Sequence, residues 1–214
     1  VNANGMVLSD DGRTLAVLNQ RWVSSNDGGG IDCPELCPAT SSLVPYVWFR
    51  SSLAVQRVDV SDPAAVQAGE RLVIDGQLVA ARRIGEQLVV VSTWTPRLPV
   101  DALPAGAGAA EREAAIARTS AADVLPRVRR NGGTPQALLA DTDCWTQPGN
   151  GSADVQVTTI TLLDLRAPDF APQSRCFVGG TQAMYMSAAH LYLATTRWAR
   201  SEERRVGKEC ATLC

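Results

Sequence analysis

The sequence contains almost no lysine and almost no histidine. Lys208 is the single lysine among 214 residues and His190 the single histidine, so nearly every basic side chain is an arginine. No stretch approaches the roughly 18 apolar residues in succession that a membrane-spanning helix needs. The formal net charge is only −2, whereas nucleic-acid-binding domains gather basic side chains on one face. The sequence therefore argues against a transmembrane segment in this stretch and against a nucleic-acid partner.

The single lysine lies in an unusual C-terminal segment. Residues 200–210 read Arg-Ser-Glu-Glu-Arg-Arg-Val-Gly-Lys-Glu-Cys, which along its whole length resembles the translation of a widely used short-read sequencing adapter. Such segments are excluded from reasoning about the fold. We expect residues 200–214 to be an artefactual tail, and residues 1–199 to be a fragment of one domain, beginning inside that domain. The alternative is a charged C-terminal helix on a solvated face.

Excluding the tail leaves four of the six cysteines, which are Cys33, Cys37, Cys144 and Cys176. An even number of cysteines flanked by loop residues favours disulfides and an oxidising compartment. Three pairings are possible, and the simplest joins Cys33 to Cys37 and Cys144 to Cys176. Free thiols and a zinc site are the alternatives. Cys33 and Cys37 have the spacing of half a zinc motif, but Cys144 and Cys176 do not supply the second half.

Most of the chain shows the pattern of short strands separated by turn residues. The sequence predicts a hairpin of residues 6–8 and 14–18 around Asp11-Gly12, and a second hairpin of residues 71–74 and 77–83 around Asp75-Gly76. Further strands are predicted at 53–60, 87–93, 155–165, 183–187 and 191–195.

One stretch breaks the strand pattern. Residues 107–118 are rich in Ala, Glu and Arg, which favour a helix, and residues 120–130 could continue as a second short helix that Pro126 interrupts. We therefore expect a helical insertion around 107–130. Three arginines at its end are expected to be solvated: Arg127, Arg129 and Arg130.

The spacing of the strands predicts an all-β fold, either a sandwich or a radial array. A unit of about 40 residues occurs twice, in 53–93 and 158–195: a strand ending in Asp-Val or Asp-Leu, a polar turn, and two hairpin strands. This is the length of a four-stranded propeller blade. The predicted fold is a partial β-propeller of several antiparallel blades, each of which packs only against its neighbours.

The order of several segments resembles a known family, the bacterial secreted proteins with a C-terminal β-propeller domain, distantly related to WD40 repeats. The segments are Val58-Asp59-Val60-Ser61-Asp62-Pro63, residues 74–82, residues 87–93, Asp143-Cys144-Trp145, and residues 185–194. The resemblance covers roughly residues 1–199. It implies a secreted, periplasmic or surface-anchored protein, and it carries over no catalytic residue and no cofactor.

Candidate chemical sites have simpler structural interpretations. Residues 26–32 with Glu35 could hold Ca²⁺ but lack the ligand spacing of a defined calcium loop. Residues 59–63 are interpreted as a turn that ends a strand, and His190 as a surface turn residue. The five tryptophans are expected to pack between blades rather than to line a binding face: Trp22, Trp48, Trp94, Trp145 and Trp198.

The sequence thus favours an extracytoplasmic binding or interaction module with a protein or glycan partner, and it identifies no catalytic, cofactor-binding or metal-binding residue. The alternative is a hydrolase or lyase with its site in the central channel of the intact propeller. Such an enzyme should bring several acidic or histidine side chains together on the axis. A third possibility is a disulfide-linked structural spacer.

Overall fold

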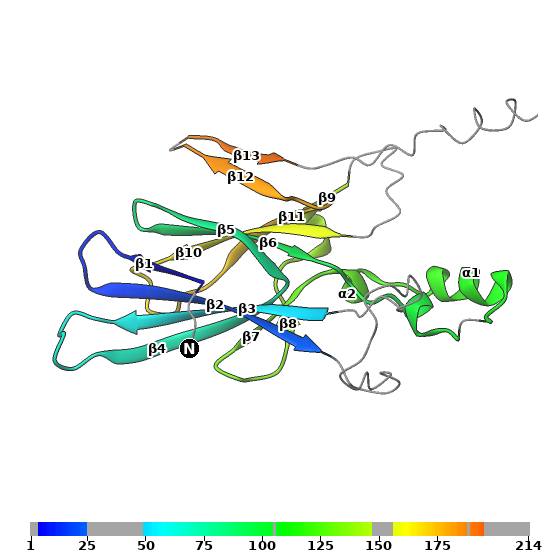
Figure 1. The fold of residues 1–214 in the computed structure, drawn as a ribbon, viewed down its shortest axis with the longest axis horizontal. Coiled ribbons are helices and arrows are strands. Elements are labelled where there is room, and N and C mark those ends of the chain that lie inside the picture. Colours follow the sequence, from blue (N-terminus) through cyan, green and yellow to red (C-terminus); the bar gives the residue numbers. More distant parts are fainter. Residues whose placement is uncertain (1–3, 25–48, 105, 147–155, 188, 195–214) are drawn as a thin grey trace, which may run out of the picture.

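The computed structural model describes residues 4–24, 49–104, 106–146, 156–187 and 189–194, which form three β-sheets and a few short helices (Figure 1). Cys33, Cys37 and the possible calcium loop at 26–32 lie outside the described residues, as do Trp48, Trp198 and the segment 200–214.

The first sheet is antiparallel and has the strand order β1-β2-β3-β4-β7-β8. Its first hairpin is the one that the sequence predicts, with Met6 opposite Val17 and Gly12 at a φ of +69° in the turn. The bounds are β1 Gly5–Leu8, β2 Thr14–Ser24, β3 Phe49–Asp59, β4 Gln67–Asp75, β7 Arg127–Arg130 and β8 Gln136–Ala137.

The second sheet has the order β5-β6-β10-β11-β9, in which only β9 runs parallel to its neighbour β11. A third sheet contains β12 and β13. The bounds are β5 Gln77–Ile84, β6 Gln87–Trp94, β9 Cys144–Trp145, β10 Val157–Asp164, β11 Gln173–Val178, β12 Ala183–Met186 and β13 Leu191–Ala194.

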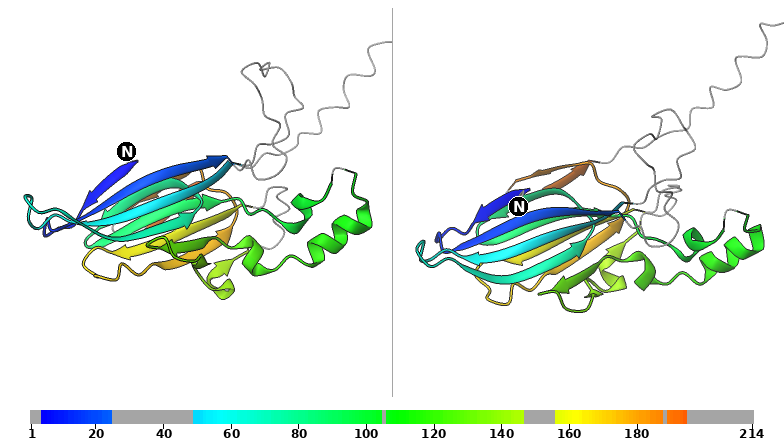
Figure 2. Two further views of the ribbon diagram at one scale, coloured as in Figure 1. Left: turned by 90° about the horizontal axis from the view of Figure 1, so that it is seen from below. Right: turned by 60° about the horizontal axis from the view of Figure 1, so that its bottom comes forward.

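The three sheets lie side by side with their first strands adjacent. Strand β5 contacts β1 of the first sheet and β12 of the third sheet, and Figures 1 and 2 show the second sheet between the other two. Each sheet faces its neighbours, as successive blades of a propeller do. The described residues form no closed ring, so the predicted partial β-propeller is confirmed.

The predicted hairpin at Asp75-Gly76 is wrong, because β4 and β5 belong to different sheets. Gly76 has a φ of +122°, and a Cβ at this position would lie 2.8 Å from the carbonyl oxygen of Thr93. The side-chain amide of Gln20 donates to the Gly76 carbonyl (3.2 Å) and accepts from the Leu78 N–H (2.7 Å). Asp75-Gly76 is therefore a crossover from the outer strand of one blade to the inner strand of the next.

This crossover changes the interpretation of the recurring unit. Residues 53–93 contain β3, β4, β5 and β6, and residues 158–195 contain β10, β11, β12 and β13. In both cases the first two strands belong to one sheet and the last two to the next. The sequence repeat is thus offset by half a blade from the structural repeat. Each repeat contains the last strands of one blade and the first strands of the next.

The main core lies between the first and second sheets. Apolar side chains that alternate along β2, β3 and β4 meet side chains of β6 and of the β10–β11 connection. Phe170, the largest fully buried side chain, enters this core from that connection with a φ of +46°. The other buried members are Ala16, Leu18, Leu53, Val55, Leu72, Leu88, Val90, Leu163 and Leu165.

The segment between β6 and β10, which includes the predicted helical insertion around 107–130, is only partly helical. It contains the 3₁₀ turns η1 (Pro99–Ala102) and η2 (Asp141–Asp143) and the helices α1 (Ala109–Ala117) and α2 (Ala121–Val124). The predicted helical character of residues 127–130 is wrong, because this segment is strand β7, in which Val73 of β4 pairs with Arg129. An open edge of β4 and the burial of alternate side chains override local helix propensity here.

Candidate binding site

The segment between β6 and β10, residues 95–156, is here called the insertion. It joins the outer edges of two blades, because β7 extends the first sheet beyond β4 and β9 extends the second sheet beyond β11. Helix α1 projects away from the sheets (Figure 2), whereas the part from α2 to β9 lies along the blades. The latter part is a surface supported by two sheets at once.

Polar contacts attach the insertion to both blades. Arg130 forms an ion pair with Glu70 of β4 and also donates to the main-chain carbonyl of Asp169, before β11. Arg175 of β11 forms an ion pair with Asp143 of η2. The prediction that Arg130 is simply solvated is therefore wrong, since its guanidinium bridges the two sheets at their outer rim.

Apolar contacts fill the space beneath the insertion. Leu138 and Leu139 are 6% and 7% exposed, and they pack in a cluster with Ile74, Val157 and Cys176. Burial of two leucines contributes on the order of 3–5 kcal/mol before the cost of ordering the chain. The segment that follows β8 is thus held against both sheets.

Cys144 and Cys176 face each other across the parallel pair of β9 and β11. Their Sγ atoms lie 1.96 Å apart, at disulfide-bonding distance, and their Cα atoms 4.4 Å apart. Cys176 is fully buried. This pair joins residues separated by 32 positions, and it fixes the end of the insertion to the second blade.

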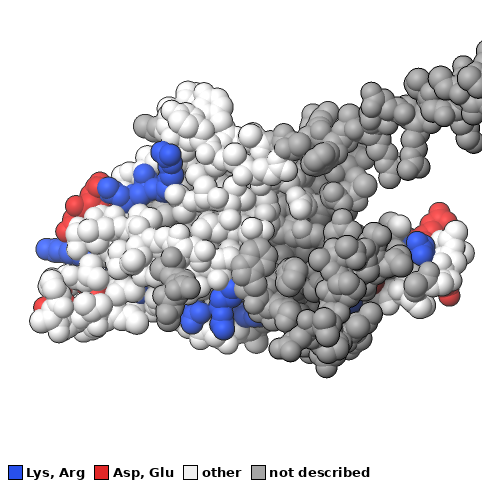
Figure 3. Space-filling model, in the orientation of Figure 1, with Lys and Arg blue, Asp and Glu red and all other residues white. Residues whose placement is uncertain are grey.

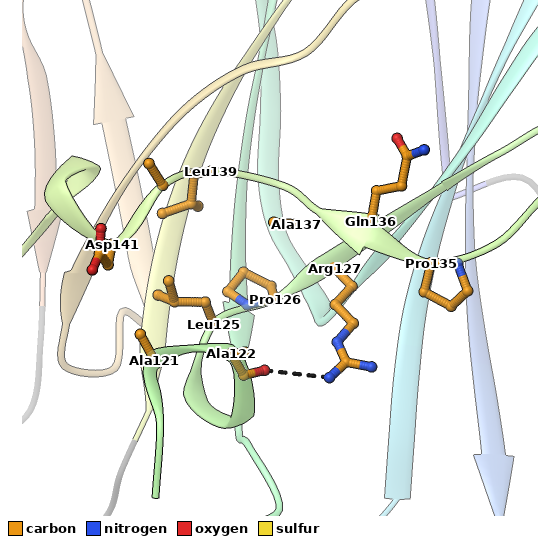
Figure 4. A pocket seen from close by; sticks show the side chains of 11 residues that line it. Ala121, Ala122, Leu125, Pro126, Arg127, Pro135, Gln136, Ala137, Leu139 and Asp141 are labelled. Atoms are coloured by element: carbon orange, nitrogen blue, oxygen red, sulfur yellow. Dashed lines mark hydrogen bonds between the residues drawn. The ribbon is translucent and has the colours of Figure 1, made fainter.

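An open pocket of about 310 Å³ lies within the insertion, between α2 and the β7–β8 hairpin (Figure 4). Its apolar lining comes from alanine, leucine and proline, with Leu125, Pro126 and Leu139 at the centre of the view. Three polar side chains also line it: Arg127, Gln136 and Asp141. Figure 4 shows Arg127 and Asp141 at opposite sides of the apolar centre.

Strand register accounts for one part of the pocket lining. Arg127 pairs directly with Ala137, and paired residues project to the same face of a sheet. Leu125 and Leu139 lie two positions from this pair, just outside the two strands, and line the same pocket. Val128 instead turns toward the core, where it contacts both hydrophobic clusters. Leu125 and Leu139 also pack in the cluster with Ile74, and Gln136, the partner of Val128, lines the pocket as well. The pocket therefore takes side chains from both faces of the hairpin.

The two ends of the pocket carry opposite charges. The Arg127 guanidinium donates to the carbonyl of Ala122 (3.3 Å), and no ion pair joins it to a carboxylate within the described residues. Hydrogen bonds from the hydroxyl and N–H of Ser120 lower the pKa of Asp123, with a smaller contribution from the charge of Arg127. Asp123 is thus engaged at the start of α2, and the Asp75 carboxylate accepts from the Arg127 main-chain N–H (3.2 Å). The Arg127 side chain is exposed, so an external anion can reach its guanidinium.

A family model for the beta propeller domain matches residues 6–211 of the chain. The chain belongs to the β-propeller domain family. This membership supports a role as a binding or interaction module. No curated protein and no solved structure gave a match. The matched range includes most of residues 200–214, and the artefactual origin of that segment stays a prediction.

The inner strands of the three described sheets contain no acidic side chains, and one of them contains arginine. Strands β1, β5 and β12 contain no Asp, Glu or His, whereas β5 contains Arg82 and Arg83. Arg83 forms an ion pair with Asp10 in the β1–β2 turn and so links two blades. On the face shown in Figure 3, acidic and basic side chains lie in small separate groups among mostly neutral ones.

The remaining candidates from the sequence have structural roles. His190 is exposed in the β12–β13 turn, its N–H donating to the Ser187 hydroxyl (3.1 Å) and its ring stacked near Tyr192. Asp59 accepts from the N–H (2.9 Å) and the hydroxyl (2.6 Å) of Ser61, and these bonds lower the pKa of Asp59. Both positions are turns, as the sequence predicts.

Two tryptophans with described side chains differ in environment. Trp94 packs against the cluster beneath the insertion, whereas Trp145 is 60% exposed, so the prediction that tryptophans pack between blades fails for Trp145. Within the described residues no group of three or more His, Cys, Asp or Glu side chains could hold a metal ion. The helices of this part of the chain are too short to cross a membrane.

Proposed function

We propose that this propeller is an extracytoplasmic binding module that engages a protein or glycan partner through the pocket in the insertion. The observation that carries the proposal is the construction of the pocket. Its walls rest on two blades, are held by the Arg130–Glu70 and Arg175–Asp143 ion pairs, and present an apolar centre between two oppositely charged side chains. A rigid support lowers the entropic cost of binding.

The paired cysteines support the extracytoplasmic part of the proposal. Disulfides persist in secreted, periplasmic and cell-surface proteins and are rare where thiols are kept reduced. The Cys144–Cys176 pair lies where it would hold the pocket-bearing segment to the second blade. A reducing compartment would remove that attachment.

Site-specific photo-cross-linking tests the binding role. Benzoylphenylalanine in place of exposed Gln136, which lines the pocket, should cross-link a partner in envelope extracts of the source organism. The matched control places the same group at exposed Gln67, at the far end of β4 from its pairing with β7. Cross-linking at Gln136 should disappear in Arg127→Glu. Equal capture from both positions would contradict the proposal.

Alkylation tests the compartment. Full-length protein recovered from its native location should be acid-quenched and treated with a maleimide polymer before and after reduction. Cys144 and Cys176 should react with the maleimide only after reduction. Peptide mass analysis should identify which cysteines have reacted. Reaction of both thiols without reductant would contradict the extracytoplasmic proposal. A channel enzyme stays the alternative from the sequence, and no observation in the described residues favours it.

A further inference from the structure

We infer that the pocket binds an extended peptide segment of a partner protein, with an aliphatic side chain in the apolar centre, an acidic residue toward Arg127 and a basic residue toward Asp141. This inference rests on the proposed function and specifies the ligand at the same site. Three features carry it: the chemistry of the lining, the exposed backbone edge beside it, and the separation of charge across it.

The lining suits an aliphatic side chain better than a sugar. Eight of the eleven residues that form the pocket are Ala, Leu or Pro, and none is aromatic. A saccharide carries a hydroxyl on most carbons, and each hydroxyl buried without a partner costs about 1–3 kcal/mol. Three polar side chains cannot satisfy such a ligand, whereas one leucine or valine side chain needs no polar partner.

The size of the pocket also favours part of a larger ligand. A volume of about 310 Å³ is at the lower limit of the roughly 300–1,000 Å³ usual for small-molecule sites. The pocket is only partly enclosed. It can therefore accept one or two side chains of a chain that continues beyond it on either side.

A strand edge beside the pocket offers main-chain hydrogen bonds. Strand β8 ends the first sheet, and the N–H of Leu138 donates to the carbonyl of Pro126 on the β7 side. Because successive residues of an antiparallel strand turn their polar groups to opposite sides, the N–H and C=O of Ala137 point away from β7. An extended peptide can pair with such an edge, which gives affinity that depends little on its sequence.

The charges set the direction of the peptide. Arg127 has a main-chain carbonyl as its hydrogen-bonding partner, so its remaining N–H groups can take a carboxylate in a bidentate pair. Asp141 is exposed and accepts from the N–H of Thr142 (2.8 Å) at one carboxylate oxygen, Oδ1. These two side chains lie on opposite sides of the apolar centre. For a peptide that pairs with β8 in one fixed strand direction, one order of acidic and basic residues therefore fits and the reverse order does not.

A random octapeptide library displayed on phage tests the inference with the full-length chain as bait. Wild-type protein should enrich sequences with Leu, Ile or Val between an acidic and a basic residue. The double variant Arg127→Glu/Asp141→Arg should enrich the opposite charge order. Arg129→Glu is the matched control, because Arg129 lies on β7, is exposed, and does not line the pocket. It should select the same peptides as wild type.

Synthetic peptides make the result quantitative. The best wild-type peptide should bind Arg127→Glu at least about tenfold more weakly and Arg129→Glu within about twofold, by fluorescence anisotropy, as expected for loss of one charge-assisted pair. Circular dichroism of each variant checks folding, and Asp141→Asn gives a second, smaller perturbation. Equal binding to wild type and Arg127→Glu, or no enrichment at all, overturns the peptide assignment.

The two proposals can fail separately. If photo-cross-linking at Gln136 captures a partner and Arg127→Glu abolishes it, while no peptide selection depends on Arg127, the binding role stands and the peptide ligand is refuted. Binding of a glycan array by wild type but not by Arg127→Glu would have the same meaning. If neither cross-linking nor selection depends on the pocket, both proposals fall.

Discussion

Replacing Cys144 and Cys176 together by alanine should lower the stability of the propeller substantially. The bond closes a loop of 32 residues, and the chain-entropy relation gives about 3.7 kcal/mol for this length. Alanine is chosen because Cys176 is fully buried, so that a serine hydroxyl would add an unrelated desolvation penalty. For a domain of this size, the loss corresponds to a decrease of about 7–15 °C in the melting temperature.

Thermal unfolding followed by circular dichroism measures this effect. The double variant is compared with a reference protein that keeps Cys144 and Cys176. Both proteins should carry alanine at the other four cysteines, so that the reference can form only the Cys144–Cys176 disulfide. The melting temperatures should differ without reductant and should converge when dithiothreitol is added before heating. A difference below about 2 °C without reductant would show that packing and ion pairs hold the insertion unaided. A difference that persists in reductant would show that lost packing, not the covalent link, causes it.

Three further predictions concern stability. Gly76→Ala should lower the free energy of unfolding in urea by at least about 2 kcal/mol, because Gly76 has a positive φ and lies close to a carbonyl of β6. Gly12 also has a positive φ but lies in open space, so Gly12→Ala should cost only about 1 kcal/mol. Equal losses in the two variants would contradict the crossover. Phe170→Ala should cost about 3–5 kcal/mol, and a loss below about 1 kcal/mol would contradict its place in the core. Because folding lowers the pKa of Asp59, the carboxylate stabilises the folded state above its unfolded pKa, and this stabilisation is lost as the pH falls through the folded pKa. The Asp59→Asn variant should therefore lose less stability than the wild type between about pH 5 and pH 2. An equal pH dependence of the two proteins would contradict this reasoning.

Local sequence predicts those parts of the propeller that depend on neighbouring residues. The first hairpin follows from an Asp-Gly turn between two alternating segments. The turn after Asp59 follows from the Asp59 carboxylate, which accepts a hydrogen bond from the N–H of Ser61, two residues later. Helix α1 follows from composition. The twofold occurrence of a unit of about 40 residues predicts blades, because each blade needs the same alternation to pack on the next.

The Asp75-Gly76 prediction failed because a turn signal does not specify which strands pair. The dipeptide allows a sharp change of direction in either case, and whether β5 folds back on β4 or crosses to a new sheet depends on distant contacts. Here the Gln20 side chain, 56 positions away from Gly76, bonds to the crossover, and the Thr93 carbonyl lies against the glycine. Neither contact leaves a trace in the local sequence.

The candidate site shows the same division. The sequence by itself determined the strand-rich repeat, the turns, the helix at 109–117 and the cysteines that could pair, since these depend on residue type and short spacing. Tertiary structure alone decided that residues 127–130 pair with β4, and so it brought Leu125 and Arg127 into one pocket lining with Leu139 and Asp141. The physical reason is that an unpaired strand edge and a buried sheet face exist only once the sheets have assembled. Pairing with that edge outweighs the modest helical preference of residues 127–130.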